Sequence, residues 1–522
     1  MKHPMTFLVF ALFLPLFLSV GAFADDQPQW GEYGTRNMIS GETGLPDSFD
    51  AGRRNTMTGL VDPTTTKNVR WTAPVGDIVY GTPIVAEGKV FVGVTDSMRQ
   101  ENPQLRGDRG VLVCLDEKTG EFLWELVTPK RTNIPYSDWN RVGICSPPAV
   151  ENGRVYLMTN RCEVICLDIN GQADGNQGPF LDEAAFSVPE GMPPLTLSDK
   201  DADIIWVNDL TESIGVMSHN GANCAILIDG DCLYVCTSNG VDWTHKYVMN
   251  PDAPTLVVLD KKTGKVIARD DFQIGPDIAH GQWSSPAMGM VNGKKLIFQG
   301  TGSGYLFALE ALTHEEVEHA KQAETPVLLK NVWRFNGHPL AQTQEEKIPI
   351  DHQHDSTSFQ ITGNPVFYDN RIYVVCTQEM HHGMKEGWLV CLDATKTGDI
   401  TRTGGLIWSY KEMTSSDSTV AIVDGLLYVA DGSGTLHCLD VNTGKPHWTH
   451  SIGDPVWASP LVADGKVYIG TGRRTFWVFA HGADKKVLSE IRMPNGIYST
   501  ATAANKTLYV PVNGTLYAVG DD

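Results

Sequence analysis

The sequence has too few basic residues for a nucleic-acid-binding protein or a protein that docks on anionic lipid. Its 522 residues include 41 Lys and Arg against 62 Asp and Glu, which gives a formal net charge of −21. Phosphate binding needs a basic face, so we expect no nucleic acid partner. After the N-terminal region no stretch approaches the roughly 20 apolar residues of a membrane-spanning helix, so we expect no transmembrane segment.

Several redox and catalytic motifs are also missing. The chain has no Cys-x-x-Cys-His haem site, no Cys-x-x-Cys pair and no two adjacent cysteines. It also lacks Gly-x-Ser-x-Gly, His-Glu-x-x-His and nucleotide-binding fingerprints. Four of the ten cysteines occupy the same place in a repeated Cys-Leu-Asp, namely Cys114, Cys166, Cys391 and Cys438. This repetition favours small core side chains over a disulfide framework.

The first 24 residues have the pattern of an export signal. A short basic start is followed by an apolar run over residues 7–20 and a small-x-small motif at residues 22–24. This order is typical of a signal peptide cleaved after Ala24. It predicts an exported protein, periplasmic or secreted, and an uncleaved N-terminal anchor is the alternative.

A tight turn between two β-rich runs recurs along the chain. Asn or Asp followed by Gly supplies the positive φ values that two-residue hairpins need. The eight turn pairs are Glu87-Gly88, Asn152-Gly153, Asp229-Gly230, Asn292-Gly293, Asp369-Asn370, Asp424-Gly425, Asp464-Gly465 and Asn505-Lys506.

Each hairpin is followed by a second set of signals. A Leu-Asp or similar pair comes first, often with Thr-Gly shortly after it, as at Thr119-Gly120 and Thr443-Gly444. A Trp then commonly closes the unit, at Trp124, Trp206, Trp333, Trp408 and Trp448. Each unit therefore contains four strands. Eight such units predict an all-β fold, an eight-bladed β-propeller of four-stranded antiparallel blades.

The two ends of the chain complement each other. The eighth unit stops after three strands, at Tyr517-Ala518-Val519, whereas Trp71 has the Trp-strand pattern with no unit before it. We therefore expect an N-terminal strand to close the ring, which also removes exposed edges. The predicted organisation is a signal peptide (1–24), an N-terminal wrap (25–67) and the propeller (68–522). Two insertions, 170–203 and 313–330, lengthen turns, and the second is predicted to be partly helical.

The repeat Leu-Asp-x-x-Thr-Gly-x-x-x-Trp, preceded by a Gly-Lys-Val-Tyr-like strand, resembles the pyrroloquinoline-quinone-type propeller repeat. The resemblance is clearest at residues 114–124 and 438–448 and covers roughly residues 68–520. Quinoprotein alcohol dehydrogenases and the outer-membrane barrel assembly lipoprotein B, a scaffold without chemistry, share this repeat. The opening segment, with Trp30 and Glu42-Thr43-Gly44-Leu45-Pro46, is similar to that of large exported propeller proteins of planctomycete type.

The two classes imply different functions. The dehydrogenases imply pyrroloquinoline quinone with calcium and an adjacent cysteine pair, which this chain lacks. The assembly protein implies a lipidated cysteine after the signal peptide, which is also missing.

Three functions therefore stay open. The first is a non-catalytic binding or assembly scaffold with a protein partner at a propeller face. The second is a quinone-dependent oxidoreductase, and the third a metal-assisted or carbohydrate-active protein. The oligomeric state is not indicated.

One candidate site lies at the mouth of the propeller axis. Counting back eight residues from the second residue of each turn pair selects one position per blade, expected near the start of its innermost strand. These are Tyr80, Cys145, Ala222, Ser285, Thr362, Asp417, Trp457 and Tyr498. Asp417 is the candidate base, and Tyr80, Trp457, Tyr498, Trp243 and Trp283 are candidate stacking surfaces. An acid beside an aromatic wall suits a planar or sugar-like ligand, unless these aromatics plug the channel.

Histidines form the second candidate site. Eight of the fifteen are assigned to loops on one propeller face: His219, His245, His280, His338, His352, His354, His381 and His382. In an extended segment His352 and His354 project to the same side, as two metal ligands would. A third ligand is expected from His381 or His382. Neutral imidazoles suit zinc, copper or iron; surface histidines without a metal are the alternative.

Overall fold

The predicted turn pairs do close hairpins in the computed structural model, which describes residues 25–55, 57–132, 138–343, 358–378, 386–453 and 455–521. In seven of the eight pairs both residues have positive φ, as at Glu87 (52°) and Gly88 (75°). The third pair is displaced by one residue. There Asp229 pairs with Cys232, so the turn residues are Gly230 and Asp231.

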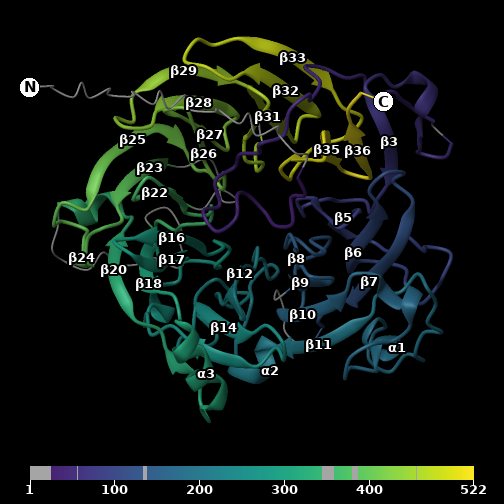
Figure 1. Cartoon of the computed structure of the whole chain (residues 1–522), viewed down its shortest axis with the longest axis horizontal. Coiled ribbons are helices and arrows are strands. Elements are labelled where there is room, and N and C mark those ends of the chain that lie inside the picture. The colour runs from purple at the N-terminus through teal and green to yellow at the C-terminus, as the bar shows by residue number, and fades with distance from the viewer. Residues whose placement is uncertain are drawn as a thin grey trace, which may run out of the picture.

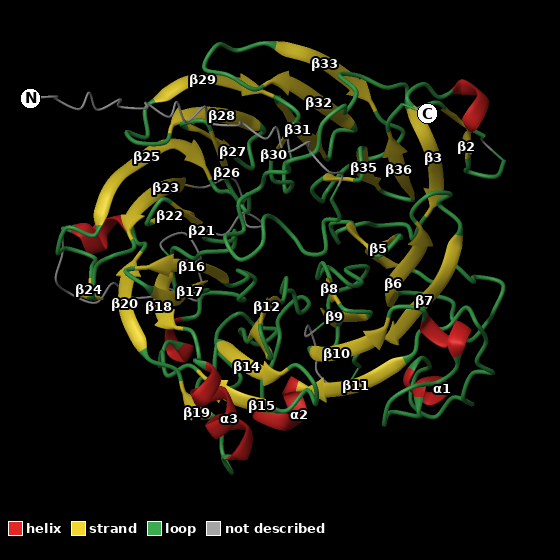
Figure 2. Cartoon of the chain, viewed as in Figure 1, coloured by secondary structure: helices red, strands yellow, loops and turns green. Residues whose placement is uncertain are grey.

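Each hairpin supplies the two inner strands of one blade, and eight blades form a ring (Figures 1 and 2). The innermost strands are β4 (Ile84–Ala86), β8 (Ala149–Glu151), β12 (Leu227–Asp229), β16 (Ala287–Val291), β21 (Val366–Tyr368), β26 (Ala421–Val423), β30 (Leu461–Ala463) and β34 (Thr502–Ala504). The second strands are β5 (Lys89–Thr95), β9 (Arg154–Met158), β13 (Cys232–Cys236), β17 (Lys294–Gly300), β22 (Arg371–Thr377), β27 (Leu426–Ala430), β31 (Lys466–Thr471) and β35 (Thr507–Val512).

The Leu-Asp and Trp signals mark the outer half of each blade. The third strands are β6 (Arg109–Asp116), β10 (Glu163–Asp168), β14 (Leu256–Asp260), β18 (Tyr305–Glu310), β23 (Glu386–Asp393), β28 (Thr435–Asp440), β32 (Thr475–Ala480) and β36 (Thr515–Val519). The fourth are β7 (Phe122–Pro129), β11 (Ile204–Asp209), β15 (Val266–Arg269), β20 (Asn331–Asn336), β25 (Leu406–Thr414), β29 (Pro446–Ser451), β33 (Val487–Arg492) and β3 (Val69–Pro74). Hydrophobic clusters between adjacent blades form the core.

The N-terminal strand closes the ring as predicted. β3 pairs antiparallel with β36, from Val69 opposite Val519 to Pro74 opposite Thr515, and is the outer strand of blade eight. Two blades differ from the four-stranded plan. β19 (Val327–Leu328) lies parallel to β15, and β24 (Gly398–Asp399) lies parallel to β20. Both additions are short outer-edge strands, contributed by turns longer than the repeat requires.

The regular spacing of Trp and Thr-Gly within the repeat is explained by packing between blades. A Trp of one blade's outer strand donates its indole N–H to a backbone carbonyl of the next blade, just after the Leu-Asp pair or its equivalent. Six blade junctions have this bond, from Trp71, Trp124, Trp206, Trp333, Trp408 and Trp448 to Glu117, Ile169, Lys261, Ala394, Val441 and Gly482, respectively. The glycine of Thr-Gly lies against the same ring. At Gly444 a Cβ atom would come within 2.4 Å of Trp408.

In the described residues, helices lie in insertions and turns. α1 (Glu183–Phe186) lies in the first predicted insertion, and α2 (Leu210–Ile214) follows β11. The helix predicted in the second insertion is α3 (His314–Gln322), which begins with a capping box between Thr313 and Glu316. Short 3-10 turns occur at Pro63–Thr65, Gly171–Asp174, Gly275–Asp277 and Pro339–Gln342.

Residues 27–40 lie across one end of the axial channel (Figure 1, purple). They hydrogen-bond to the innermost strand of every blade, through Val85, Val150, Ile228, Met288, Phe367, Ile422, Val462 and Ala503. Strand edges that face the channel thereby gain hydrogen-bond partners. We call residues 27–40 the axial segment. A small ribbon of β1 (Arg53–Arg54) and β2 (Val61–Asp62) follows it.

Candidate axial binding site

A cavity of about 740 Å³ lies on the propeller axis. Every blade contributes to its wall, and Trp30 of the axial segment also lines it. All eight positions selected by the count from the turns line the cavity: Tyr80, Cys145, Ala222, Ser285, Thr362, Asp417, Trp457 and Tyr498. They lie in the loops just before the innermost strands rather than at the starts of these strands. The aromatic side chains among them line the channel and leave space for a ligand.

Three aromatic side chains form one wall of the cavity. Tyr80, Trp457 and Tyr498 come from blades one, seven and eight, which are neighbours in the ring. Their ring centroids are 5.8 Å apart for Tyr80 and Trp457, 5.7 Å for Tyr80 and Tyr498, and 4.7 Å for Trp457 and Tyr498. Burial raises the pKa of Tyr80 to about 12, so its hydroxyl keeps its proton at neutral pH and can donate a hydrogen bond.

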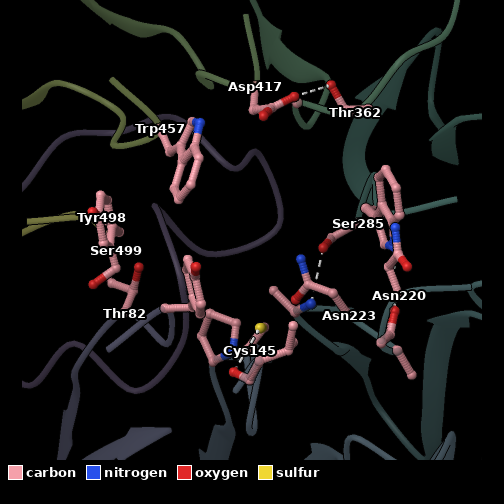
Figure 3. Close-up of a pocket in the computed structure, with 18 of the residues that line it drawn as sticks. Thr82, Cys145, Asn220, Asn223, Ser285, Thr362, Asp417, Trp457, Tyr498 and Ser499 are labelled. Carbon is pink, nitrogen blue, oxygen red and sulfur yellow. Dashed lines mark hydrogen bonds between the residues drawn. The ribbon is translucent and has the colours of Figure 1, made fainter. Parts of the chain in front are cut away.

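Asp417 lies beside this wall (Figure 3). Its Oδ1 accepts a hydrogen bond of 2.6 Å from the Thr362 hydroxyl. Among the described lining residues Asp417 is the single carboxylate, and none of them is Lys or Arg. The other polar lining groups are the histidines His245 and His280 and the hydroxyl and amide side chains, including Thr82, Asn220, Asn223, Ser285, Asn364, Ser459, Ser499 and Thr500. The cavity thus offers aromatic faces and many neutral hydrogen-bonding groups.

The opposite side of the cavity contains the two remaining stacking candidates. The Trp283 indole N–H donates to the Gly221 carbonyl at 3.2 Å, which fixes its ring. Trp243 is 58% exposed and stands at the rim. The structure therefore brings all six residues proposed as the base or stacking surfaces to one cavity.

The histidines selected as metal ligands, His352, His354, His381 and His382, lie outside the described residues. Three other loop histidines do meet. One possible ligand atom from each of His219, His245 and His280 lies within 4.8 Å of the other two, and His245 and His280 line the cavity. The sequence placed them on the same face but could not select them, because they are far apart along the chain and follow no motif.

The cysteines give no redox pair. All ten are free, and Cys145 is the single one that lines the cavity. Burial raises the pKa of its thiol to about 12, and the thiol donates to the Val142 carbonyl at 3.6 Å. Cys145 is therefore a protonated thiol rather than a nucleophile at neutral pH.

Comparisons with known proteins agree on the repeat and the fold. A family model described as outer membrane protein assembly factor BamB matches residues 385–519. The 1-butanol dehydrogenase (cytochrome c) of Thauera butanivorans is 33% identical over 88 residues. That match covers 14% of this chain and 13% of the relative, so it spans only a small part of either protein.

Two solved structures show the same fold. BamB from Moraxella catarrhalis has a TM-score of 0.50 at 12% identity, covering 87% of this chain and 99% of that one. A europium-containing methanol dehydrogenase has a TM-score of 0.57 at 13% identity, covering 95% and 98%. The chain is an eight-bladed propeller with pyrroloquinoline-quinone-type repeats. Within the described part of the chain, no helix is long and apolar enough to cross a membrane.

The described cavity residues do not fit pyrroloquinoline quinone with calcium. The quinone is a planar tricarboxylate, and buried carboxylates need cationic partners, yet no Lys or Arg is among the described lining residues. Calcium takes six to eight oxygen ligands from carboxylates, carbonyls and water, and Asp417 is the single carboxylate that the described lining offers it. Cys145 has no adjacent cysteine with which to form a disulfide.

Proposed function

We propose that this propeller is an exported binding protein whose axial cavity holds a neutral, ring-shaped, polyhydroxylated molecule such as a sugar. The observation that carries the proposal is the open cavity of about 740 Å³ with an aromatic wall beside Asp417. This volume lies in the usual range for small-molecule sites.

The chemistry of the lining favours a sugar. Flat aromatic faces such as Trp457 stack on the apolar face of a sugar ring, while hydroxyl groups hydrogen-bond to Asp417 and to the neutral amides and hydroxyls around it. An anionic ligand would have no Lys or Arg partner among the described lining residues. Preformed aromatic surfaces also limit the side-chain ordering that binding would otherwise require.

Calorimetric titration with a panel of mono- and oligosaccharides tests the proposal. We expect at least one to bind, and Trp457→Ala to weaken that binding about tenfold or more. Asp417→Asn should weaken it less, because the amide retains one acceptor oxygen. Tyr247→Ala is the matched control, since Tyr247 is 68% exposed and is not among the lining residues. No binding at millimolar sugar would refute the proposal.

A protein-binding scaffold is the second candidate, favoured by the BamB family-model match over residues 385–519. In that case a propeller face contacts a protein partner and the cavity is incidental. Ala222→Phe separates the two functions, because Ala222 is buried and lines the cavity. Filling the cavity should abolish sugar binding and leave a face-bound protein partner attached.

Export itself is tested by sequencing the N-terminus of the mature protein, which we expect to begin at Asp25.

A further inference from the structure

Three histidines from separate loops meet at the rim of the axial cavity. His219 precedes β12, His245 lies between β13 and β14, and His280 precedes β16. The ring centroids are 4.7 Å apart for His219 and His245, 4.5 Å for His219 and His280, and 4.8 Å for His245 and His280. We call these three residues the histidine cluster. Among the residues that the structure describes, no carboxylate belongs to this cluster.

The two buried members are held in fixed orientations. His219 Nδ1 lies 2.9 Å from the Val241 carbonyl oxygen. A carbonyl oxygen only accepts, so Nδ1 carries the hydrogen and Nε2 presents its lone pair. Metal-binding histidines are commonly oriented in this way, by donating the second ring nitrogen to a carbonyl or carboxylate. The His280 ring packs edge-on against Trp283, with centroids 5.4 Å apart.

The third member lies on a strained turn. His245 has φ of 58°, unusual for a residue other than glycine. The Asp242 carboxylate closes this turn by accepting hydrogen bonds from the Thr244 hydroxyl and the backbone N–H groups of Lys246 and Tyr247. Strained backbone kept in place by such a network is a recurrent feature of functional sites. Here it brings the His245 ring to the other two.

We propose that the histidine cluster binds one Zn²⁺ ion through three neutral imidazoles, with a fourth coordination position open toward the axial cavity. Zn–N bonds are about 2.0–2.1 Å long, so ligand nitrogens in a tetrahedral site are about 3.3 Å apart. The possible ligand atoms of the three histidines lie within 4.8 Å of one another. Small side-chain movements, which the partly exposed His245 can make, would bring them to the distance that zinc requires. Three imidazoles without a carboxylate select zinc or copper over calcium or magnesium.

The open position follows from the placement of the ligands. His245 and His280 are among the residues that line the cavity, whereas His219 is not, and both His219 and His280 are 1% exposed. An ion held between the three therefore has protein on one side and the cavity on the other. Three protein ligands with one free position is the arrangement of zinc sites that bind water or substrate.

Zinc titration of the full mature chain tests this site, after dialysis against a chelator and without any sugar, so that failure here and failure of the sugar proposal are seen separately. We expect one Zn²⁺ per chain by calorimetry, a rise in melting temperature on zinc addition, and a tetrahedral Co²⁺ spectrum in the visible range. His219→Ala and His280→Ala should each weaken zinc binding by on the order of 100-fold. His245→Ala should do the same, and its partly exposed position makes it the variant most certain to fold.

Two controls make the result specific to the histidine cluster. His447→Ala, in the exposed part of β29, should leave zinc affinity unchanged. The double variant His352→Ala, His354→Ala should also leave it unchanged. The proposal is overturned if no stoichiometric zinc binds. It is also overturned if zinc binding survives the substitutions in the cluster or is lost only in the double variant.

Discussion

Single residues set how closely one blade docks on the next. Gly444 has φ of 67°, and a Cβ atom there would lie 2.4 Å from the Trp408 ring. Trp408 in turn donates to the Val441 carbonyl at 3.1 Å. We predict that Gly444→Ala lowers the free energy of unfolding by about 2–4 kcal/mol, because backbone strain costs about 1–2 kcal/mol and the displaced Trp408 adds an overpacking cost. Denaturant unfolding followed by tryptophan fluorescence measures this.

Gly425→Ala is the matched control for that comparison. Gly425 also has positive φ, at 80°, but no atom lies within 4 Å of the site of its Cβ. Its substitution should cost the backbone strain alone, about 1–2 kcal/mol. If Gly444→Ala and Gly425→Ala lowered the free energy of unfolding equally, the contact with Trp408 would not require glycine at position 444.

At the scale of elements, the axial segment depends on one buried cation. The Arg36 guanidinium is fully buried and donates to the carbonyls of Ala225 at 2.7 Å, Pro286 at 2.9 Å and Trp30 at 3.0 Å. Burial lowers its pKa to about 10, so it is still charged at neutral pH. We predict that Arg36→Ala lowers the free energy of unfolding by about 3 kcal/mol or more, because two buried carbonyls and one partly buried carbonyl lose their donor.

Hydrogen exchange with mass spectrometry locates that effect. Residues 27–40 and the innermost strands β4, β8 and β16 should exchange faster in Arg36→Ala, while the outer strands stay protected. Arg53→Ala, on the exposed strand β1, should change none of these rates. If only the outer strands exchanged faster, the axial segment would not be the element that Arg36 stabilises.

At the scale of the molecule, the ring and its aromatic wall could be predicted from the sequence because a repeat fixes equivalent positions. Once the turns are found, Tyr80, Asp417 and Trp457 follow by counting. The axial segment could not be predicted in this way, because the hydrogen bonds that hold it across the channel join it to strands distant in sequence. The histidine cluster has the same limitation: its members come from loops of unequal length, and only the closed ring brings them together.

The closure of the ring leads to a final prediction about the whole molecule. In seven blades the outer strand comes later in the same repeat unit as the third strand, whereas in blade eight the outer strand β3 comes from the N-terminal part of the chain and pairs with β36 by non-covalent contacts. The Trp71 indole N–H donates to Glu117 of blade one at 2.9 Å. Its ring also lies near Tyr509, at a centroid distance of 5.9 Å. Trp71→Ala should therefore open the ring locally, with β3 and β36 exchanging backbone hydrogens at least about tenfold faster while blades three to five stay protected.

Trp408→Ala provides the comparison, because Trp408 makes the equivalent bond from a blade that is continuous in sequence. It should lower overall stability, yet leave β3 and β36 slow to exchange. Tyr80 and Tyr498 belong to blades one and eight, which meet at the closure, so Trp71→Ala should also weaken ligand binding in the cavity more than Trp408→Ala does. Uniformly faster exchange in all blades of Trp71→Ala would mean instead that the ring opens only by global unfolding.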